Sequence, residues 1–238
     1  MSRFLRMGSV VVNPKRAFNE IAESPDFFGL VFVLAASVLA SLGAQYVLWT
    51  TKITFFDVDL GKVASPAFPY AYYGLSELFS FGVVYLGRNF VMYYILSWVL
   101  RGERDAGLLL ACTGYTLVTQ LVGRLIQVFL SYAAFPSVRY QVSTETSIVL
   151  LTASVQQVLA HQENWARTTA FNQEAALVWQ MSAAVKGFSY FTYVVNAWTA
   201  LVAIPMIYAV TRLSWRRSAA VAGSVLALDT AFFVYSLI

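Results

Sequence analysis

Five long apolar runs limit what this chain can fold into. They cover residues 27–48, 78–100, 107–129, 188–210 and 219–238. Each is close to the roughly 20 residues that an α-helix needs to cross the hydrocarbon of a bilayer. Of the 238 residues, 59% are hydrophobic and only 12% are charged, which is too few charges to cover a water-soluble surface. The sequence therefore predicts an all-α, polytopic transmembrane helical bundle with five spans.

The first apolar run is expected to stay in the membrane as a helix. A polar lead of 26 residues precedes it, and the run is longer than the about 7 to 15 apolar residues of a signal peptide. We divide the chain into an N-terminal amphipathic segment (1–26), the first three spans with an aromatic outer loop (27–130), an outer helical loop (131–187) and the last two spans (188–238).

Basic residues predict the orientation, because cytoplasmic connections carry the excess of Lys and Arg. On one side of the membrane they are Arg3, Arg6, Lys15, Arg16, Arg101, Arg104, Arg212, Arg216 and Arg217. The other side has Lys52, Lys62, Arg139, Arg167 and Lys186, spread over two longer loops. We therefore expect the N-terminus in the cytoplasm and the C-terminus outside. In a prokaryotic cell the membrane would be the plasma membrane.

A short helix is expected before the first span. Asn13 has the character of an N-cap and Pro14 fits the first turn of the helix that follows. Phe18 and Ile21 lie on one side at helical spacing. Two interpretations are open: this face dips into the cytoplasmic leaflet, or it packs on the cytoplasmic loops.

The two outer loops have different compositions. The first, from Trp49 to about Glu77, is rich in Trp, Phe and Tyr, which is typical of anchors at a membrane interface and less so of a ligand site. The second, residues 131–187, is too long for a simple turn. Apolar residues recur at helical spacing over 148–159 and again over 177–185, so we expect a helical extramembrane segment, which could also bind a partner.

Charged residues inside the spans are costly, and three of them need an account. At a rise of about 1.5 Å per residue, Arg88 lies about 20 Å above Arg101, and Asp229 lies about 18 Å above Arg217. We therefore expect Arg88 and Asp229 to face each other. Arg124 falls at the outer headgroups, where it can snorkel without a partner.

The Arg88 and Asp229 pair has two interpretations. It could be a clamp that fixes helix pairing or part of a proton or ion relay. A relay usually contains several acids, whereas Asp229 is the only carboxylate well inside a span, so the clamp is favoured. Asn89, Gln120 and Asn196 are further polar residues at span depth, and interhelical hydrogen bonding is their usual role.

The sequence offers little for catalysis, metals or nucleic acid. Cys112 is the only cysteine and lies in an apolar run, and His161 is the only histidine. No metal-ligand spacing, cofactor motif, or pair of nucleophile and base stands out, so we expect no cofactor, no metal and no enzymatic activity. Basic residues flank the spans and do not gather on one polar element, which argues against a nucleic-acid partner.

Three stretches together resemble the Yip (Ypt-interacting protein) family of five-span membrane proteins. The first is NPKRAFNEI at 13–21 with Ser24-Pro25, ahead of an apolar helix. The second is GERDAG at 102–107 followed by Gly114-Tyr115. The third is Trp198 with SWRRSA at 214–219. A proline that the family often places after Gly-Tyr is absent, with Thr119 and Gln120 in that region, and the loop 131–187 is long.

The resemblance implies a polytopic scaffold without enzymatic activity, which in eukaryotes assists vesicle traffic and the membrane association of Rab-type GTPases. The short lead before the first span is more similar to the prokaryotic branch, so GTPase binding is not carried over. The leading hypothesis is thus a scaffold in the lipid bilayer that binds a membrane-protein partner or a second copy of itself. The alternative is a small transporter or channel subunit with a polar pathway near Arg88 and Asp229.

Overall fold

The computed structural model describes residues 3–57, 62–64, 70–103, 105–142 and 177–236. This part of the chain is mostly helical. It divides into two compact units, one of Met1–Val38, Leu78–Gly123 and Phe191–Ile238, the other of Leu39–Glu77 and Arg124–Tyr190. The helical pattern expected at 148–159 lies outside the described residues, as do residues 65–69 of the aromatic loop and Arg104.

Two short helices open the first unit, α1 (Arg3–Val12) and α2 (Pro14–Glu23). The Asn13 side-chain oxygen accepts a hydrogen bond from the backbone N–H of Arg16 at 3.3 Å, and Pro14 occupies the first turn of α2. The expected helix start is therefore confirmed. Helix α1 was not expected from the sequence, although its apolar residues recur at helical spacing.

The apolar face of α2 is buried inside the protein. Ala17, Phe18 and Ile21 are fully buried, and α2 contacts α1 and α6 (Ala106–Thr116). Of the two interpretations of this face, insertion of Phe18 and Ile21 into the leaflet is wrong, and packing on the protein is right. The amphipathic pattern could not separate them because both environments accept the same apolar stripe.

Among the described residues, three helical segments are long and apolar enough to cross a membrane: Phe28–Lys52, Ala106–Ala133 and Ala183–Thr211. The first consists of α3 (Phe28–Val47) with the π-helix η1 (Leu48–Lys52). The second consists of α6 with α7 (Val118–Ala133), and the third is α11 (Ala183–Thr211). They match the expected first, third and fourth spans, and they make the chain an integral membrane protein.

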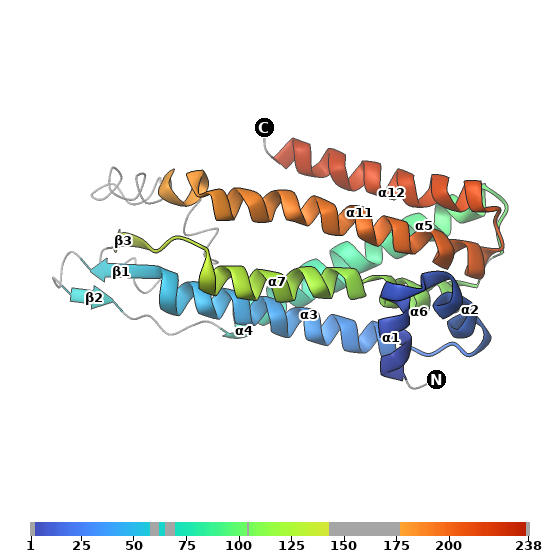
Figure 1. Ribbon diagram of the computed structural model, residues 1–238, viewed down its shortest axis with the longest axis horizontal. Helices are drawn as coiled ribbons and strands as arrows, with labels where there is room; N and C mark the ends of the chain where they lie inside the picture. The colour runs from blue at the N-terminus through green and yellow to red at the C-terminus, as the bar shows by residue number, and fades with distance from the viewer. Residues whose placement is uncertain (1–2, 58–61, 65–69, 104, 143–176, 237–238) are drawn as a thin grey trace. The chain divides into compact units, whose positions relative to one another are not determined.

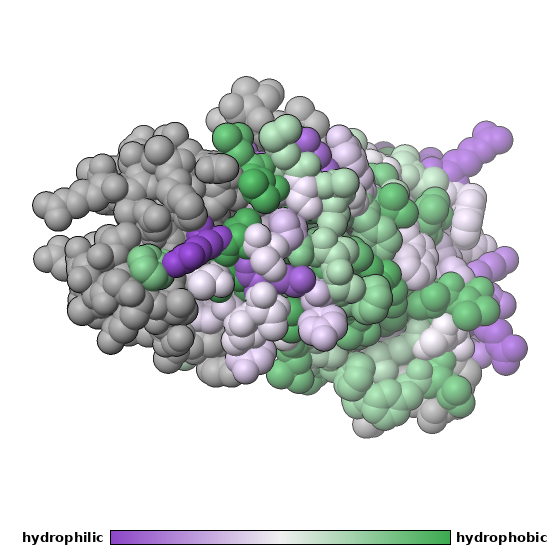
Figure 2. All heavy atoms as spheres, turned by 60° about the vertical axis from the view of Figure 1, so that its left-hand side comes forward, coloured by the Kyte–Doolittle hydropathy of each residue, from purple (hydrophilic) through white to green (hydrophobic). Residues whose placement is uncertain are grey.

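The residues expected to form the second and fifth spans are also helical, although they are not among those three segments. Residues 70–99 form α4 (Tyr70–Glu77), the π-helix η2 (Leu78–Gly87) and α5 (Arg88–Val99). The last helix, α12 (Trp215–Ser236), lies beside α5 in the first unit (Figure 1). Large apolar side chains such as Val31, Leu201 and Trp98 are exposed on several of these helices, and apolar residues cover much of the described surface in Figure 2.

The core of the first unit is the junction between α6 and α7. Every residue from Ala111 to Gln120 is buried, including Cys112 and the hydroxyl residues Thr113, Thr116 and Thr119. The Thr113 and Thr116 hydroxyls donate to backbone carbonyls one helical turn earlier. These bonds allow a helix with polar side chains to pass through an apolar core, because the Thr113 and Thr116 hydroxyls both have acceptors.

The second unit contains a small sheet, so the all-α expectation is wrong for residues 53–57, 62–64 and 138–142. Strand β1 (Ile53–Asp57) lies between β2 (Lys62–Ala64) and β3 (Val138–Val142), antiparallel to β2 and parallel to β3 (Figure 1). The register places Ile53 opposite Val138. Arg139 stacks 4.3 Å over the ring of Phe56. Part of the segment that the sequence analysis interpreted as an interfacial aromatic belt therefore forms β1, and β1 pairs with β3, the strand that follows α7.

Candidate functional site

A polar cluster lies in the core of the first unit, where five helical elements supply side chains. We define it by Tyr85 of η2, Arg88 and Asn89 of α5, Thr119 and Gln120 of α7, Asn196 and Thr199 of α11, and Asp229 of α12. It contains all five site residues expected from the sequence: Arg88, Asn89, Gln120, Asn196 and Asp229. The cluster has two parts, an ion pair and a hydrogen-bonded amide and hydroxyl network.

The ion pair joins α5 to α12. An Arg88 guanidinium nitrogen contacts the carboxylate of Asp229, whose side chain is only 8% exposed. The guanidinium also lies over the ring of Tyr85, 5.4 Å from its centroid. Each charge offsets part of the cost of removing the other from water. Depth counted along the two helices had placed these residues level with each other, and the structure brings them into contact.

Gln120 is the centre of the hydrogen-bonded network. Its Nε2 lies 2.9 Å from Asn196 Oδ1, 2.9 Å from Tyr85 Oη and 2.9 Å from Thr199 Oγ1. An amide nitrogen carries two hydrogens, so three acceptors share two donors. The Thr199 hydroxyl also lies 2.6 Å from that of Thr119. The network therefore holds η2, α7 and α11 together at one level.

Asn89 differs from the other members of the cluster. Its side chain is 2% exposed, and among the described residues no hydrogen bond to its Oδ1 is found. The Nε of the neighbouring Arg88 is likewise buried without a partner there. An unpaired buried polar atom costs about 1–3 kcal/mol of stability. Helix packing alone therefore does not explain why polar atoms are placed at Asn89 Oδ1 and Arg88 Nε.

Sequence reasoning missed Tyr85, Thr119 and Thr199. Tyr85 precedes Arg88 by three residues and Thr199 follows Asn196 by three, which is the spacing of neighbours on one helix face. Thr119 is adjacent to Gln120 in the chain. A search for hydroxyls one helical turn from each intramembrane amide or charge would have found two of the three residues.

A second set of polar contacts, which we call the Asp26 latch, lies where α3 begins. Arg6 Nη1 donates to Asp26 Oδ2 at 2.9 Å and to the Ser24 carbonyl at 2.9 Å. The backbone N–H of Phe28 and the hydroxyl of Tyr115 both donate to Asp26 Oδ1, at 2.9 and 2.8 Å. One carboxylate therefore caps α3 and joins it to α1 and α6.

Two glycines permit the close crossing of α3 and α6 beside this latch. A Cβ on Gly114 would lie 2.5 Å from the Cα of Leu30, and one on Gly29 would lie 2.5 Å from the ring of Tyr115. Real Cβ atoms do not approach other atoms so closely, hence neither position accepts a side chain without separating the helices. The Gly114-Tyr115 dipeptide thus combines a close backbone contact with a hydrogen bond to Asp26.

Arg124 corrects one expectation in the second unit. We expected it to snorkel without a partner, but its Nη2 lies 3.5 Å from the Glu77 carboxylate. Its Nη1 also lies 3.5 Å from the Ser41 hydroxyl. The depth of Arg124 along its own helix does not reveal that Glu77, at the end of α4, lies beside it.

A comparison with known protein families identifies the family of this chain. Residues 8–237 match the Yip1 domain. No curated protein and no solved structure matches the chain. The matched residues include Asp26, the Gly114-Tyr115 dipeptide and the whole polar cluster. Because it covers nearly the full length, the chain belongs to the Yip1 family.

Proposed function

We propose that this protein is a non-catalytic membrane scaffold that crosses the bilayer five times and binds another membrane protein or a second copy of itself. Its N-terminus is in the cytoplasm and its C-terminus is outside. Such a protein would act in membrane organisation or traffic through the surfaces that it presents, with lipid as its main surrounding and no nucleic acid as partner.

The observation that carries this proposal is the use of the polar cluster for helix packing. Gln120 bonds to side chains of two other helical elements, and Arg88 is paired with Asp229 of α12. Side chains that are bonded to one another across helices fix which helices pack together. They are poorly suited to a catalytic cycle, which requires groups free to bind a substrate.

The first experiment is affinity purification of the tagged protein in a gentle detergent, beside an Asp229→Asn variant. Glu103→Gln serves as control because it removes the same charge from an exposed residue. A stoichiometric partner retained by all three proteins, or a stable homo-oligomer, supports the scaffold. A monomer without any partner in all three contradicts it.

The alternative function is a small transporter or channel subunit, and Asn89 is the observation that favours it. Its buried Oδ1 and the Arg88 Nε lack partners among the described residues, so an ion or a polar solute could find ligands there. Purified protein in liposomes would then conduct protons or a small solute. Asp229→Asn should abolish the flux if the pathway exists, whereas Glu103→Gln should not.

A charge exchange tests whether Arg88 and Asp229 act as a clamp. Arg88→Asp and Asp229→Arg each bury two like charges and should reduce the yield of monodisperse protein severely, because a broken buried pair costs about 3–5 kcal/mol. The double exchange restores opposite charges and should recover much of that yield. A double variant as poor as either single variant would show that the pair is not a clamp.

A further inference from the structure

The outward side of helix α1 is apolar, whereas a helix on a water-exposed surface is expected to turn polar residues outward. Its exposed side is formed by Phe4, Leu5, Gly8 and Val12, of which Leu5 is 61% and Val12 84% exposed. At 3.6 residues per turn these positions fall on one side of the helix. Its opposite side, with Met7 and Val10, is buried.

Arg3 is the first residue of α1, and the one charged side chain further along the helix points inward. Arg6 is the only charged residue between positions 4 and 12, and its guanidinium is held by Asp26 and the Ser24 carbonyl in the Asp26 latch. The face formed by Phe4, Leu5, Gly8 and Val12 contains no charged residue. The latch also fixes which side of α1 is turned outward, because Arg6 lies opposite Leu5, Gly8 and Val12.

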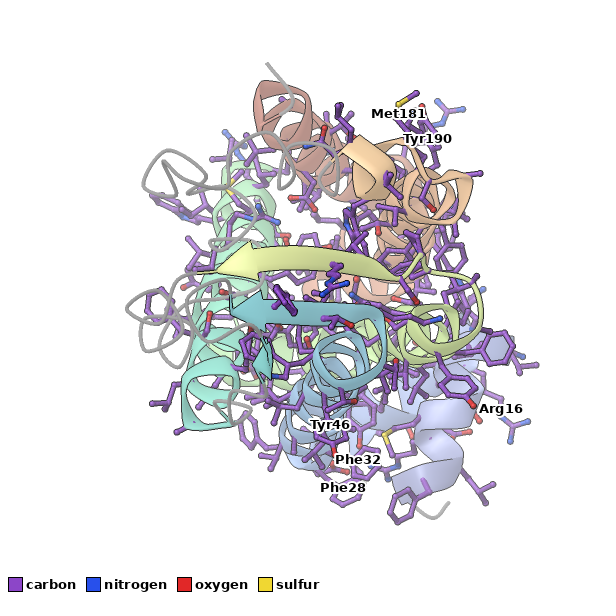
Figure 3. All side chains as sticks on the ribbon, turned by 90° about the vertical axis from the view of Figure 1, so that its left-hand side faces the viewer. Arg16, Phe28, Phe32, Tyr46, Met181 and Tyr190 are labelled. Atoms are coloured by element: carbon purple, nitrogen blue, oxygen red, sulfur yellow. The ribbon has the colours of Figure 1, made fainter. Side chains whose placement is uncertain are left out.

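The exposed face of α1 continues onto the apolar surface of α3. The Phe4 ring packs edge-on against Phe28 and Phe32, with centroids 5.2 and 5.3 Å apart, and those two rings stack on each other. Figure 3 shows Phe28 and Phe32 side by side on the outer side of α3. Val31, beside them on α3, is 62% exposed. In a segment that crosses the membrane, such side chains face lipid.

The direction of α1 suits a position in the membrane interface. Figure 1 shows α1 running across the axis of α3, at the end where α3 begins. If α3 crosses the bilayer, α1 lies roughly in the membrane plane. Basic residues flank it in α2: Lys15 is exposed, and Arg16, which pairs with Glu20 at 2.9 Å, points away from the helices (Figure 3). Cations at this level favour an anionic lipid surface.

We propose that α1 is an interfacial helix whose Leu5, Gly8 and Val12 face inserts into the boundary between headgroups and acyl chains of an anionic leaflet. Phe4 joins this face to the lipid-facing side of α3. A protein partner fits less well, since four residues of one helix of 10 residues cover far less than the roughly 800 Å² per partner of a stable interface. The inference does not depend on the scaffold function.

Spin labels on the exposed face test the depth of α1. Gly8→Cys and Val12→Cys are made in a Cys112→Ala background, because Cys112 is the only cysteine. Side chains at both positions have room: a Cβ on Gly8 meets no atom within 4 Å. Glu23→Cys, exposed on α2, is the control for water, and Val31→Cys is the control for lipid. The proteins are reconstituted in phosphatidylcholine and phosphatidylglycerol vesicles, and collisions with oxygen and with a nickel chelate are measured.

Both labels on α1 should collide with oxygen more, and with nickel less, than the Glu23→Cys label, corresponding to a depth of about 5–10 Å. Nickel collisions equal to those of Glu23→Cys would place the face in water and overturn the proposal. Immobile labels that neither reagent reaches would show that protein covers α1, which also overturns it.

A second measurement uses the unmodified chain and does not depend on the variants folding. The protein is reconstituted with a phosphatidylcholine that carries a photoactivatable diazirine near its headgroup, and the labelled peptides are identified by mass spectrometry. Lipid adducts between Phe4 and Val12 are expected. Adducts on α3 without any on α1 would contradict the proposal.

Discussion

Gln120 carries more of the polar cluster than any other residue. Its amide nitrogen is shared by the side chains of Tyr85, Asn196 and Thr199. Gln120→Leu leaves these groups in the core without their donor, and interhelical bonds of this kind are worth about 0.6–2 kcal/mol. We expect a lower melting temperature in detergent. Gln127→Leu, on the same helix but outside the cluster, is the control, and an equal loss at both positions would contradict the central role of Gln120.

The hydroxyl of Tyr115 makes one bond of the Asp26 latch, so its removal should have a limited effect. Tyr115→Phe keeps the ring packed on Gly29 and loses only the bond to Asp26, at a cost of about 0.5–1.5 kcal/mol. Asp26→Ala also loses the cap of α3 and the Arg6 ion pair and should cost clearly more. Tyr132→Phe, at an exposed position, should change the free energy of unfolding little. If Asp26→Ala were no worse than Tyr115→Phe, the latch would contribute little to stability.

At the scale of elements, Gly114 at the crossing of α3 and α6 can be compared with Gly223 of α12, because only Gly114 has no space for a side chain. Gly114→Ala places a methyl group 2.5 Å from the backbone of Leu30, whereas a methyl group on Gly223 of α12 meets no atom within 4 Å. Ala is the better helix former by about 0.5–1 kcal/mol. We therefore expect Gly114→Ala to lower thermal stability and Gly223→Ala to preserve or raise it. Similar losses in both variants would mean that α6 does not approach α3 as closely as described.

The sequence predicted some elements better than others. The difference depends on how far apart in the sequence the interacting residues of each element lie. The start of α2 was readable because Asn13 bonds to Arg16 three residues away. The level of Arg88 and Asp229 could be counted along single helices. The sheet could not be foreseen, because Ile53 pairs with Val138 far along the chain. The Asp26 latch could not be foreseen either, because Tyr115 is also far from Asp26 in the sequence. The burial of the apolar face of α2 depends on α1 and α6, which pack against it, and the pattern of α2 alone does not reveal these neighbours.

At the scale of the whole molecule, contacts within the first unit bear on the number of spans. The backbone N–H of Glu103 donates to the Thr211 carbonyl at 2.8 Å, and Asp26 bonds to Tyr115. The start of α3 therefore lies beside the C-terminal part of α6, and the end of α11 lies beside the residues just before α6. If α3 leaves the cytoplasm and ends outside, the chain must return across the membrane before Glu103. The helical residues 70–99 are the ones available to do so.

The five-span topology predicts the side of each connection. Reporter fusions made after Gly102, Tyr140, Ser214 and Ile238, in a bacterial host, should give fluorescent protein inside for Gly102 and Ser214 and active alkaline phosphatase outside for Tyr140 and Ile238. A three-span chain would put Gly102 outside, because residues 78–100 would not cross. An inactive phosphatase at Ile238 would show that α12 does not cross, even though it starts on the basic side at Arg216 and Arg217 and is 22 residues long, about the length required.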